Sequence, residues 1–129
     1  MISSDIYNYI NVLNKAADAA WLQETAISNN IANQDTPGYK RQDVDFESTL
    51  ERELGRSKYE SLDSKVKNLH INHLNVTTYT DSAGYSYRLD KNNVDPEQEY
   101  VSLASAQIKY SALIDSMNSE YARIKSVIK

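Results

Sequence analysis

The feature that most constrains this chain is an apolar heptad repeat at each end. In residues 4–33 the repeat advances by alternating steps of four and three residues, and only Glu24 interrupts it. Its apolar members are Ile6, Ile10, Leu13, Ala17, Ala20, Ile27 and Ile31. A spacing of 3.5 residues keeps a narrow apolar stripe on one side of a helix, where a second helix can cover it. The pattern therefore predicts a long N-terminal helix with a seam for a partner.

Residues 95–129 carry a second heptad repeat, which has a clear start. Asp95 can cap a helix whose first residue is Pro96, and Gln98 stands where a capping box places its second polar residue. Only Gln107 interrupts the apolar series. Its members are Tyr100, Leu103, Tyr110, Ile114, Met117, Tyr121, Ile124 and Ile128. The two repeats together predict a mainly α fold, in which two long terminal helices pack as a coiled-coil-like pair.

The stretch between the repeats has no regular apolar period and is predicted to be irregular. Residues 43–47 alternate charged and apolar residues, so they fit either a short extended stretch or the approach to a short helix, Phe46–Leu54, which Gly55 would end. Val76–Thr80 and residues 85–89 are rich in β-prone residues, separated by a short polar stretch that contains a glycine. This spacing predicts a short β-hairpin within the middle segment.

The first repeat ends at a proline turn, Thr36-Pro37-Gly38-Tyr39. A residue before proline avoids the helical region, so the helix should stop at or before Asp35. Pro37 and Gly38 fit the two central positions of a type II turn, in which the second residue has positive φ. We therefore expect three parts: an N-terminal helix and turn (1–39), a variable middle segment (40–94) and a C-terminal helix (95–129). Both ends are expected to form one elongated domain.

The composition argues against several classes of function. The 129 residues carry a formal net charge of −4 with both signs interspersed, so no basic stripe is available for nucleic acid. Without cysteine, the chain cannot form disulfides or zinc thiolate sites. The N-terminus lacks the basic and apolar regions of a signal peptide, and no apolar run is long enough to cross a bilayer. We expect no nucleic-acid partner and no cleaved leader.

Two groups of residues invite a chemical interpretation. His70 and His73 have the spacing of metal-binding histidines on a helix, which would suit a small metal-dependent hydrolase, but the chain has no third histidine. Asp43, Asp45 and Glu47 could face one way along a strand, but they lack the glycine and closing glutamate of a calcium loop. A solvated polar segment and a solvated strand face are the better interpretations. We therefore predict no catalytic residue, metal, cofactor or small-molecule substrate.

The end of the first repeat carries the most specific pattern in the chain. It resembles the signature N-x-A-N-x-x-T-P-G-Y, which occurs near the N-terminus of flagellar rod and hook proteins. The matching residues are Asn30, Ala32, Asn33, Thr36, Pro37, Gly38 and Tyr39. The continuation through Asp43-Val44-Asp45-Phe46 is similar to the FlgB family of proximal rod proteins. The stretch Asn92-Asn93-Val94-Asp95 resembles the same family, although Lys91 stands where the family has glycine.

The resemblance implies a structural, non-catalytic subunit of the bacterial flagellar basal-body rod. Such proteins polymerise helically with themselves and with other rod and basal-body proteins, forming a drive shaft in the periplasmic space. They are exported unfolded through the flagellar type III export apparatus, without cleavage of a signal peptide. The alternative is a soluble coiled-coil adaptor or secretion chaperone, which would close as a symmetric dimer through the same seams.

For a rod subunit, the helix seams are the expected assembly interface. The residues predicted at this interface are Ile6, Ile10, Leu13, Ile27, Ile31, Leu103, Tyr110, Ile114, Met117, Tyr121, Ile124 and Ile128.

Overall fold

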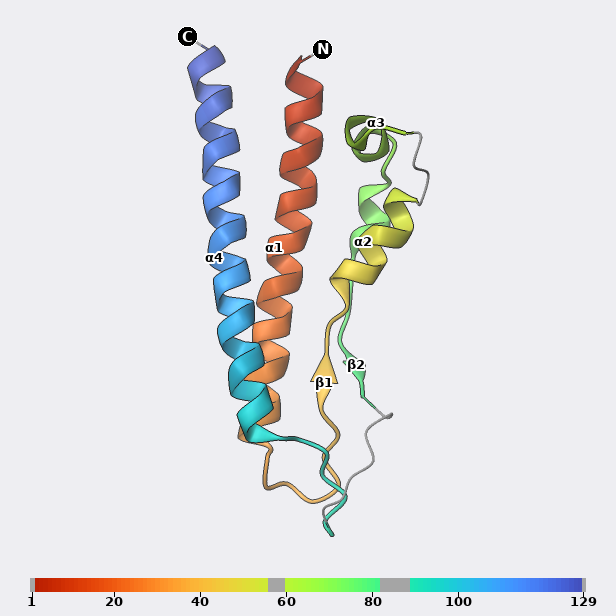
Figure 1. The fold of residues 1–129 in the computed structure, drawn as a ribbon, viewed down its shortest axis with the longest axis vertical. Helices are drawn as coiled ribbons and strands as arrows, with labels where there is room; N and C mark the ends of the chain where they lie inside the picture. Colours follow the sequence, from red (N-terminus) through yellow and green to blue (C-terminus); the bar gives the residue numbers. More distant parts are fainter. Residues whose placement is uncertain (1, 56–59, 82–88, 129) are drawn as a thin grey trace. The chain divides into compact units, whose positions relative to one another are not determined.

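The computed structural model describes residues 2–55, 60–81 and 89–128, with side chains in the first helix described from Tyr7 onward. Two long helices account for most of these residues, as the heptad repeats predict (Figure 1). They are α1 (Ile2–Ala32) and α4 (Pro96–Val127). Between them come β1 (Gln42–Asp43), α2 (Phe46–Leu54), α3 (Leu62–Lys67), the 3-10 helix η1 (Ile71–Leu74) and β2 (Tyr79–Thr80). The predicted mainly α fold with a small β element in the middle is confirmed.

Local signals fix the ends of the two long helices. α1 stops at Ala32, four residues before Thr36 would have to adopt a helical conformation ahead of proline. α4 begins at Pro96, and the Oδ1 atom of Asp95 accepts a hydrogen bond from the amide of Glu97 at 3.2 Å. Asp95 thus satisfies one of the free amides at the start of α4. Within the described ranges, no helix is both long and apolar enough to span a membrane.

The acidic stretch after β1 forms a helix start and not a strand face. The Oδ1 atom of Asp45 accepts a hydrogen bond from the amide of Ser48 at 3.1 Å and caps α2, whose first turn contains Glu47. Of the two alternatives for residues 43–47, the structure has the approach to a helix, α2, and Gly55 ends that helix with φ +77°. The expectation that Asp43, Asp45 and Glu47 share one strand face is therefore wrong, because a capping carboxylate lies between the strand and the helix.

The small sheet joins two segments that are far apart in the sequence. β1 and β2 pair antiparallel, with Gln42 opposite Thr80 and Asp43 opposite Tyr79. β2 lies in the predicted β-prone stretch, but its described partner is β1. Of the other arm of the predicted hairpin, Leu89 lies in a turn and residues 85–88 lie outside the described residues.

Contacts divide the chain into two compact units, which are described separately. Unit 1 comprises residues 1–19, 45–76 and 111–129, and unit 2 comprises residues 20–44 and 77–110. In unit 1, α2 packs against η1. Tyr9 donates a hydrogen bond to Asp63, and Lys15 donates one to Asn75, so both residues tie α1 to the middle segment. The buried apolar side chains of unit 1 are Ile10, Ala17, Ala19, Phe46, Val66 and Leu74.

In unit 2, the end of α1 and the start of α4 are antiparallel neighbours. The rings of Trp21 and Tyr110 lie 5.9 Å apart, and Asn30 lies within hydrogen-bond distance of Glu99. These two helix segments therefore run in opposite directions. The buried apolar residues of unit 2 are Ala20, Ala26, Ile27, Val44, Val94 and Ala106, and three buried polar residues, Asn30, Asn92 and Glu99, accompany them.

Replacing Leu74 tests the core of unit 1. Leu74 is 1% exposed and Leu62 is 57% exposed, so the pair provides a buried site and a surface site with the same side chain. We expect Leu74→Ala to lower the free energy of unfolding by about 2–5 kcal/mol, and Leu62→Ala to change it by less than about 0.5 kcal/mol. Urea unfolding followed by circular dichroism measures both. Equal losses in the two variants would contradict the packing described.

Candidate functional site: a polar junction between the turn motif and the last helix

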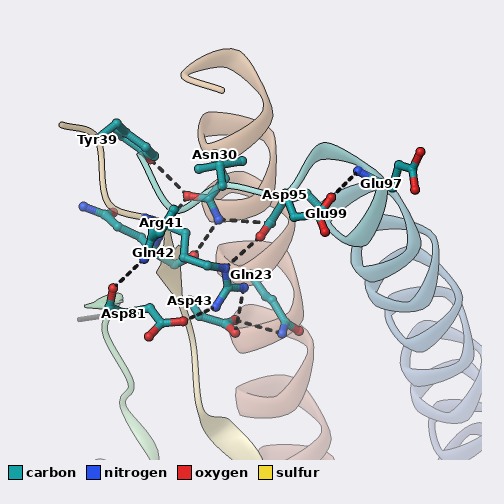
Figure 2. A network of polar contacts seen from close by, with 12 residues as sticks. Gln23, Asn30, Tyr39, Arg41, Gln42, Asp43, Asp81, Asp95, Glu97 and Glu99 are labelled. Atoms are coloured by element: carbon teal, nitrogen blue, oxygen red, sulfur yellow. Dashed lines mark hydrogen bonds and ion pairs between the residues drawn. The ribbon is translucent and has the colours of Figure 1, made fainter. Parts of the chain in front are cut away.

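The buried polar residues of unit 2 belong to one hydrogen-bonded cluster, which we call the junction (Figure 2). Its members are Asn30, Tyr39, Arg41, Asp43, Asp81, Asn92, Asn93 and Glu99. They come from the end of α1, the turn motif and β1, the residue after β2, the approach to α4 and the first turn of α4. The junction therefore links segments that lie far apart along the chain.

Asn30 is fully buried and uses both ends of its side-chain amide. Its Nδ2 group donates to the carbonyl of Gln42 at 2.8 Å and to Oε2 of Glu99 at 3.1 Å. Its Oδ1 atom accepts from the hydroxyl of Tyr39 at 3.0 Å and from the amide of Gln42 at 2.9 Å. These four bonds use two donors and two acceptor sites, which is what an asparagine amide offers. Asn30 therefore ties α1 both to β1 and to α4.

Arg41 gathers three carboxylates around one guanidinium group. Its Nε donates to Glu99 at 2.8 Å, its Nη1 to Asp81 at 2.9 Å and its Nη2 to Asp43 at 3.3 Å. Glu99 is only 2% exposed, so its charge needs compensation inside the protein. Burial alone would lower the pKa of Arg41, but the hydrogen bonds to Glu99 and Asp81 raise that pKa above its ordinary value. Arg41 therefore stays charged and holds Glu99 in place.

Tyr39 contributes a neutral hydroxyl to the junction. Burial, and then the nearby negative charge of Glu99, raise the pKa of Tyr39 above its ordinary value. Both causes disfavour a second negative charge at this place. The hydroxyl therefore keeps its proton and donates a hydrogen bond to Oδ1 of Asn30.

Asn92 binds the backbone of the turn that follows α1, although it lies far away in the sequence. The Nδ2 group of Asn92 donates to the carbonyls of Asn33, Gln34 and Thr36 at 2.8, 3.1 and 2.8 Å, across 56 to 59 positions of sequence. Its Oδ1 atom accepts from the amide of Val94 at 2.8 Å. Asn92 thus holds the turn after α1 to the segment that precedes α4.

The turn motif has the geometry that its sequence predicts. The amide of Tyr39 donates to the carbonyl of Thr36 at 3.2 Å, and Gly38 has φ +75°, as the third residue of a type II turn requires. The amide of Gly38 also donates to the carbonyl of Asp90 at 2.6 Å. Lys91, at the position where the family pattern has glycine, has φ +63°. The backbone therefore keeps the left-handed conformation there despite the lysine side chain.

Asn93 connects the turn motif with the end of β2. Its Oδ1 atom accepts from the amide of Arg41 at 2.7 Å, and its Nδ2 group donates to the carbonyl of Asp81 at 2.9 Å. The amide of Asp81 in turn donates to the carbonyl of Arg41 at 2.9 Å. This closed set of bonds fixes the position of Arg41, from which the guanidinium group reaches Glu99.

The hydrogen bonds of the junction position chain segments relative to one another within unit 2. The charged atoms of the junction are bonded to one another, and none of its members is a serine, cysteine or histidine. The two histidines lie in unit 1, with ring centroids 5.3 Å apart, and Nδ1 of His73 lies 3.0 Å from Oε2 of Glu53. In the part of the chain that the structure describes, no three histidine, aspartate or glutamate side chains are grouped so that they could hold a metal ion.

Comparison with known proteins identifies the family. A family model described as flagella basal body rod protein matches residues 10–40. The chain is 34% identical to the flagellar basal body rod protein FlgB of Bacillus subtilis over 128 residues, which cover 99% of this chain and 95% of that protein. The FlgB protein of Borrelia hermsii is 30% identical over 93% of this chain and 95% of its own length. The chain belongs to the FlgB family of flagellar basal body rod proteins. The Escherichia coli member is 25% identical over 83% of each chain.

In the structure, five of the seven FlgB-family turn residues form hydrogen bonds to one another or to the segment that precedes α4. Asn30 and Tyr39 are bonded to each other, and Thr36 Oγ1 donates to Asn33 Oδ1 at 3.1 Å. Gly38 is bonded to Asp90 through its amide. The remaining two residues, Ala32 and Pro37, are exposed. They end the helix and start the turn without joining the polar cluster.

Three central residues of the junction are not among the site residues that the sequence predicts. Arg41, Asn92 and Glu99 make contacts over 56 to 59 positions of sequence, which no local pattern reveals. Glu99 lies in the first turn of the predicted C-terminal helix, where acidic residues are common. A signal does exist for Asn92, since it lies in the second stretch that resembles the FlgB family.

The predicted seam residues have different degrees of burial. On α1, Ile10 and Ile27 are buried, Leu13 and Ile31 are partly buried, and the side chain of Ile6 lies outside the described residues. On α4, the less exposed side repeats in steps of four and three residues from Glu99. It comprises Glu99, Leu103, Ala106, Tyr110, Leu113, Met117, Glu120 and Ile124. Of the predicted α4 seam, Leu103, Tyr110, Met117 and Ile124 lie on this side, Ile114 borders it and is partly buried, and Tyr121 and Ile128 are exposed.

A double-mutant cycle tests the ion pair at the centre of the junction. Arg41→Gln leaves the buried Glu99 without its cation and should lower the free energy of unfolding by about 3–5 kcal/mol. In the background of Glu99→Gln, the same change should cost about 2 kcal/mol less, because no buried charge remains to be compensated.

Urea unfolding of the four proteins gives this coupling free energy. Arg123→Gln is the matched control, because Arg123 forms an exposed pair with Glu120 at 3.1 Å and should matter by less than about 0.5 kcal/mol. Additive effects of Arg41→Gln and Glu99→Gln would show that the pair does not hold the junction together.

Proposed function

We propose that this chain is a structural subunit of the bacterial flagellar basal-body rod and that it has no catalytic role. The observation that carries the proposal is its similarity to the FlgB protein of Bacillus subtilis over nearly the full length of both chains. The junction supports it, because the charged groups there bind one another and determine how the segments of unit 2 are arranged. The relatives named above are all rod proteins, so nothing among them favours a coiled-coil adaptor or secretion chaperone.

We further propose that the subunit polymerises with itself and with other rod proteins through its terminal helices. The start of α4 exposes Val101 and Ile108, which are seven residues apart and therefore lie on the same side of the helix. Counting 100° per residue places this side opposite the one that carries Ala106 and Tyr110. Trp21 on α1 is exposed as well. Large apolar side chains at such positions gain stability when a neighbouring subunit covers them.

The seam residues that remain exposed belong to the same proposal. Tyr121 and Ile128 lie near the end of α4 and are open to solvent in the single chain. A helix of a neighbouring subunit would cover them in an assembled rod. As in the FlgB family that the sequence resembles, we place the subunit in the proximal rod within the periplasmic space. The route of delivery would be the flagellar type III export apparatus, without a cleaved signal peptide.

A charge on the outer side of α4 tests the assembly proposal. Ile108 is 72% exposed, so Ile108→Asp should leave the helix content and the free energy of unfolding of the purified subunit within about 0.5 kcal/mol of the parent. In the rod the same carboxylate would be buried against a neighbour, which costs several kcal/mol without a partner. We expect cells that make this variant at a normal level to be non-motile.

Complementation of a strain that lacks the parent gene measures the outcome, with swimming motility and immunoblots of purified basal bodies as readouts. Asn118→Asp is the matched control, because it adds the same charge at an exposed polar position of α4 and should restore swimming. If Ile108→Asp enters basal bodies as well as the control does, this side of α4 is not an assembly surface.

A further inference from the structure

A strained residue lies directly beside Asn92, which binds the turn that follows α1. Lys91 has φ +63°, a region in which a side chain with a Cβ atom is disfavoured, and Asn92 follows it immediately. The carbonyl of Lys91 accepts a hydrogen bond from the Nζ group of Lys40. Backbone strain persists where surrounding contacts determine the conformation. Here the surrounding contacts are the three bonds from Asn92 to the turn that follows α1.

The turn motif depends on this segment at several points. The carbonyl of Thr36 receives both the side chain of Asn92 and the amide of Tyr39. The amide of Gly38 donates to Asp90, and the amide of Asn93 donates to the carbonyl of Tyr39 at 3.4 Å. Displacing residues 90–93 would therefore break bonds on both sides of the turn at the same time.

We infer that residues 90–93 form a latch, in which Asn92 holds the end of α1 and the turn motif closed while the strain at Lys91 favours opening. The bonds of Asn92 outweigh the strain in the closed form. Opening leaves the carbonyls of Asn33, Gln34 and Thr36 without their common donor. It also removes the acceptor of the Gly38 amide, so the whole turn is released together.

The latch has a consequence for the use of the turn motif. A turn held only by its own hydrogen bonds would keep its conformation when residues 90–93 move. A latched turn instead opens when residues 90–93 are displaced. The position of the segment that follows, from Tyr39 to Asp43, then depends on a segment about 50 residues further along the chain. The inference concerns this chain by itself and does not rest on the rod assembly proposed above.

Hydrogen exchange on the full-length protein tests the latch through amides that are remote from the substitutions. Asn92→Ala removes the bonds of this side chain to the turn and should lower the protection of the Gly38, Tyr39 and Gln42 amides by about tenfold or more. Lys91→Gly removes the strain and should raise the protection of the same amides by about threefold. The amide of Ile27, in the middle of α1, should change little in either variant.

The two variants are expected to change the protection of these amides in opposite directions. The test therefore remains decisive even if Asn92→Ala is poorly folded, because Lys91→Gly relieves strain and removes none of the hydrogen bonds of Asn92. Asn75→Ala is the control, since Asn75 belongs to unit 1 and accepts its bond from Lys15. It should leave the three turn amides unchanged. Two results would overturn the inference. One is a change confined to residues 91–95, and the other is an equal loss at the turn and at Ile27, which would indicate global destabilisation.

Discussion

The arrangement of unit 2 depends on keeping one charged side chain, Glu99, away from water. A buried carboxylate is costly unless cations and hydrogen-bond donors surround it. Glu99 receives Arg41 on one oxygen and Asn30 on the other. To bring Arg41 there, the chain must reverse after α1, and Gly38 provides the positive φ for that reversal. The turn, β1 and the start of α4 therefore all contribute to compensating the buried charge of Glu99.

The same interaction accounts for the rotation of α4 relative to its apolar pattern. Sequence periodicity favours Tyr100 as the first seam residue, yet Tyr100 is exposed and Glu99 is buried. Glu99, bound by Arg41 and Asn30, replaces Tyr100 on the less exposed side, whereas Leu103 and Tyr110 stay on it, so the stripe is shifted by only about half a residue. The less exposed stripe then continues through Ala106 and Leu113, and the apolar side chains of Val101 and Ile108 stay outside.

The features that the sequence predicts are those with local causes. Pro37 and Pro96 determine where the long helices end and begin, and Asp45 and Gly55 determine the bounds of α2, because each acts within about four residues. The junction could not be predicted in this way, since Arg41 and Glu99 are 58 positions apart. Nothing in a heptad pattern indicates that a glutamate beside the seam will be buried. The antiparallel pairing of β1 with β2 is hidden for the same reason.

Polar and apolar surfaces thus make different kinds of contact in this chain. The polar junction binds segments of the same molecule, and we propose that the apolar outer side of α4 binds neighbouring molecules. A subunit of this kind needs a fixed internal geometry, because any error in the direction of its segments would recur in every copy of an assembly. The junction is where that geometry is set.

The most direct test of this account is the substitution Asn30→Asp, which preserves shape and replaces the donor to Glu99 by a second carboxylate. At pH 7 we predict a loss of about 2–4 kcal/mol in the free energy of unfolding, measured by urea denaturation against the exposed control Asn29→Asp. Burial and Glu99 should raise the pKa of the new carboxyl in the folded protein above its usual value of about 3.9. The folded form then binds the proton more tightly, so the loss should shrink as the pH falls toward about 4. A variant as stable as the parent at pH 7, with no such pH dependence, would contradict the account.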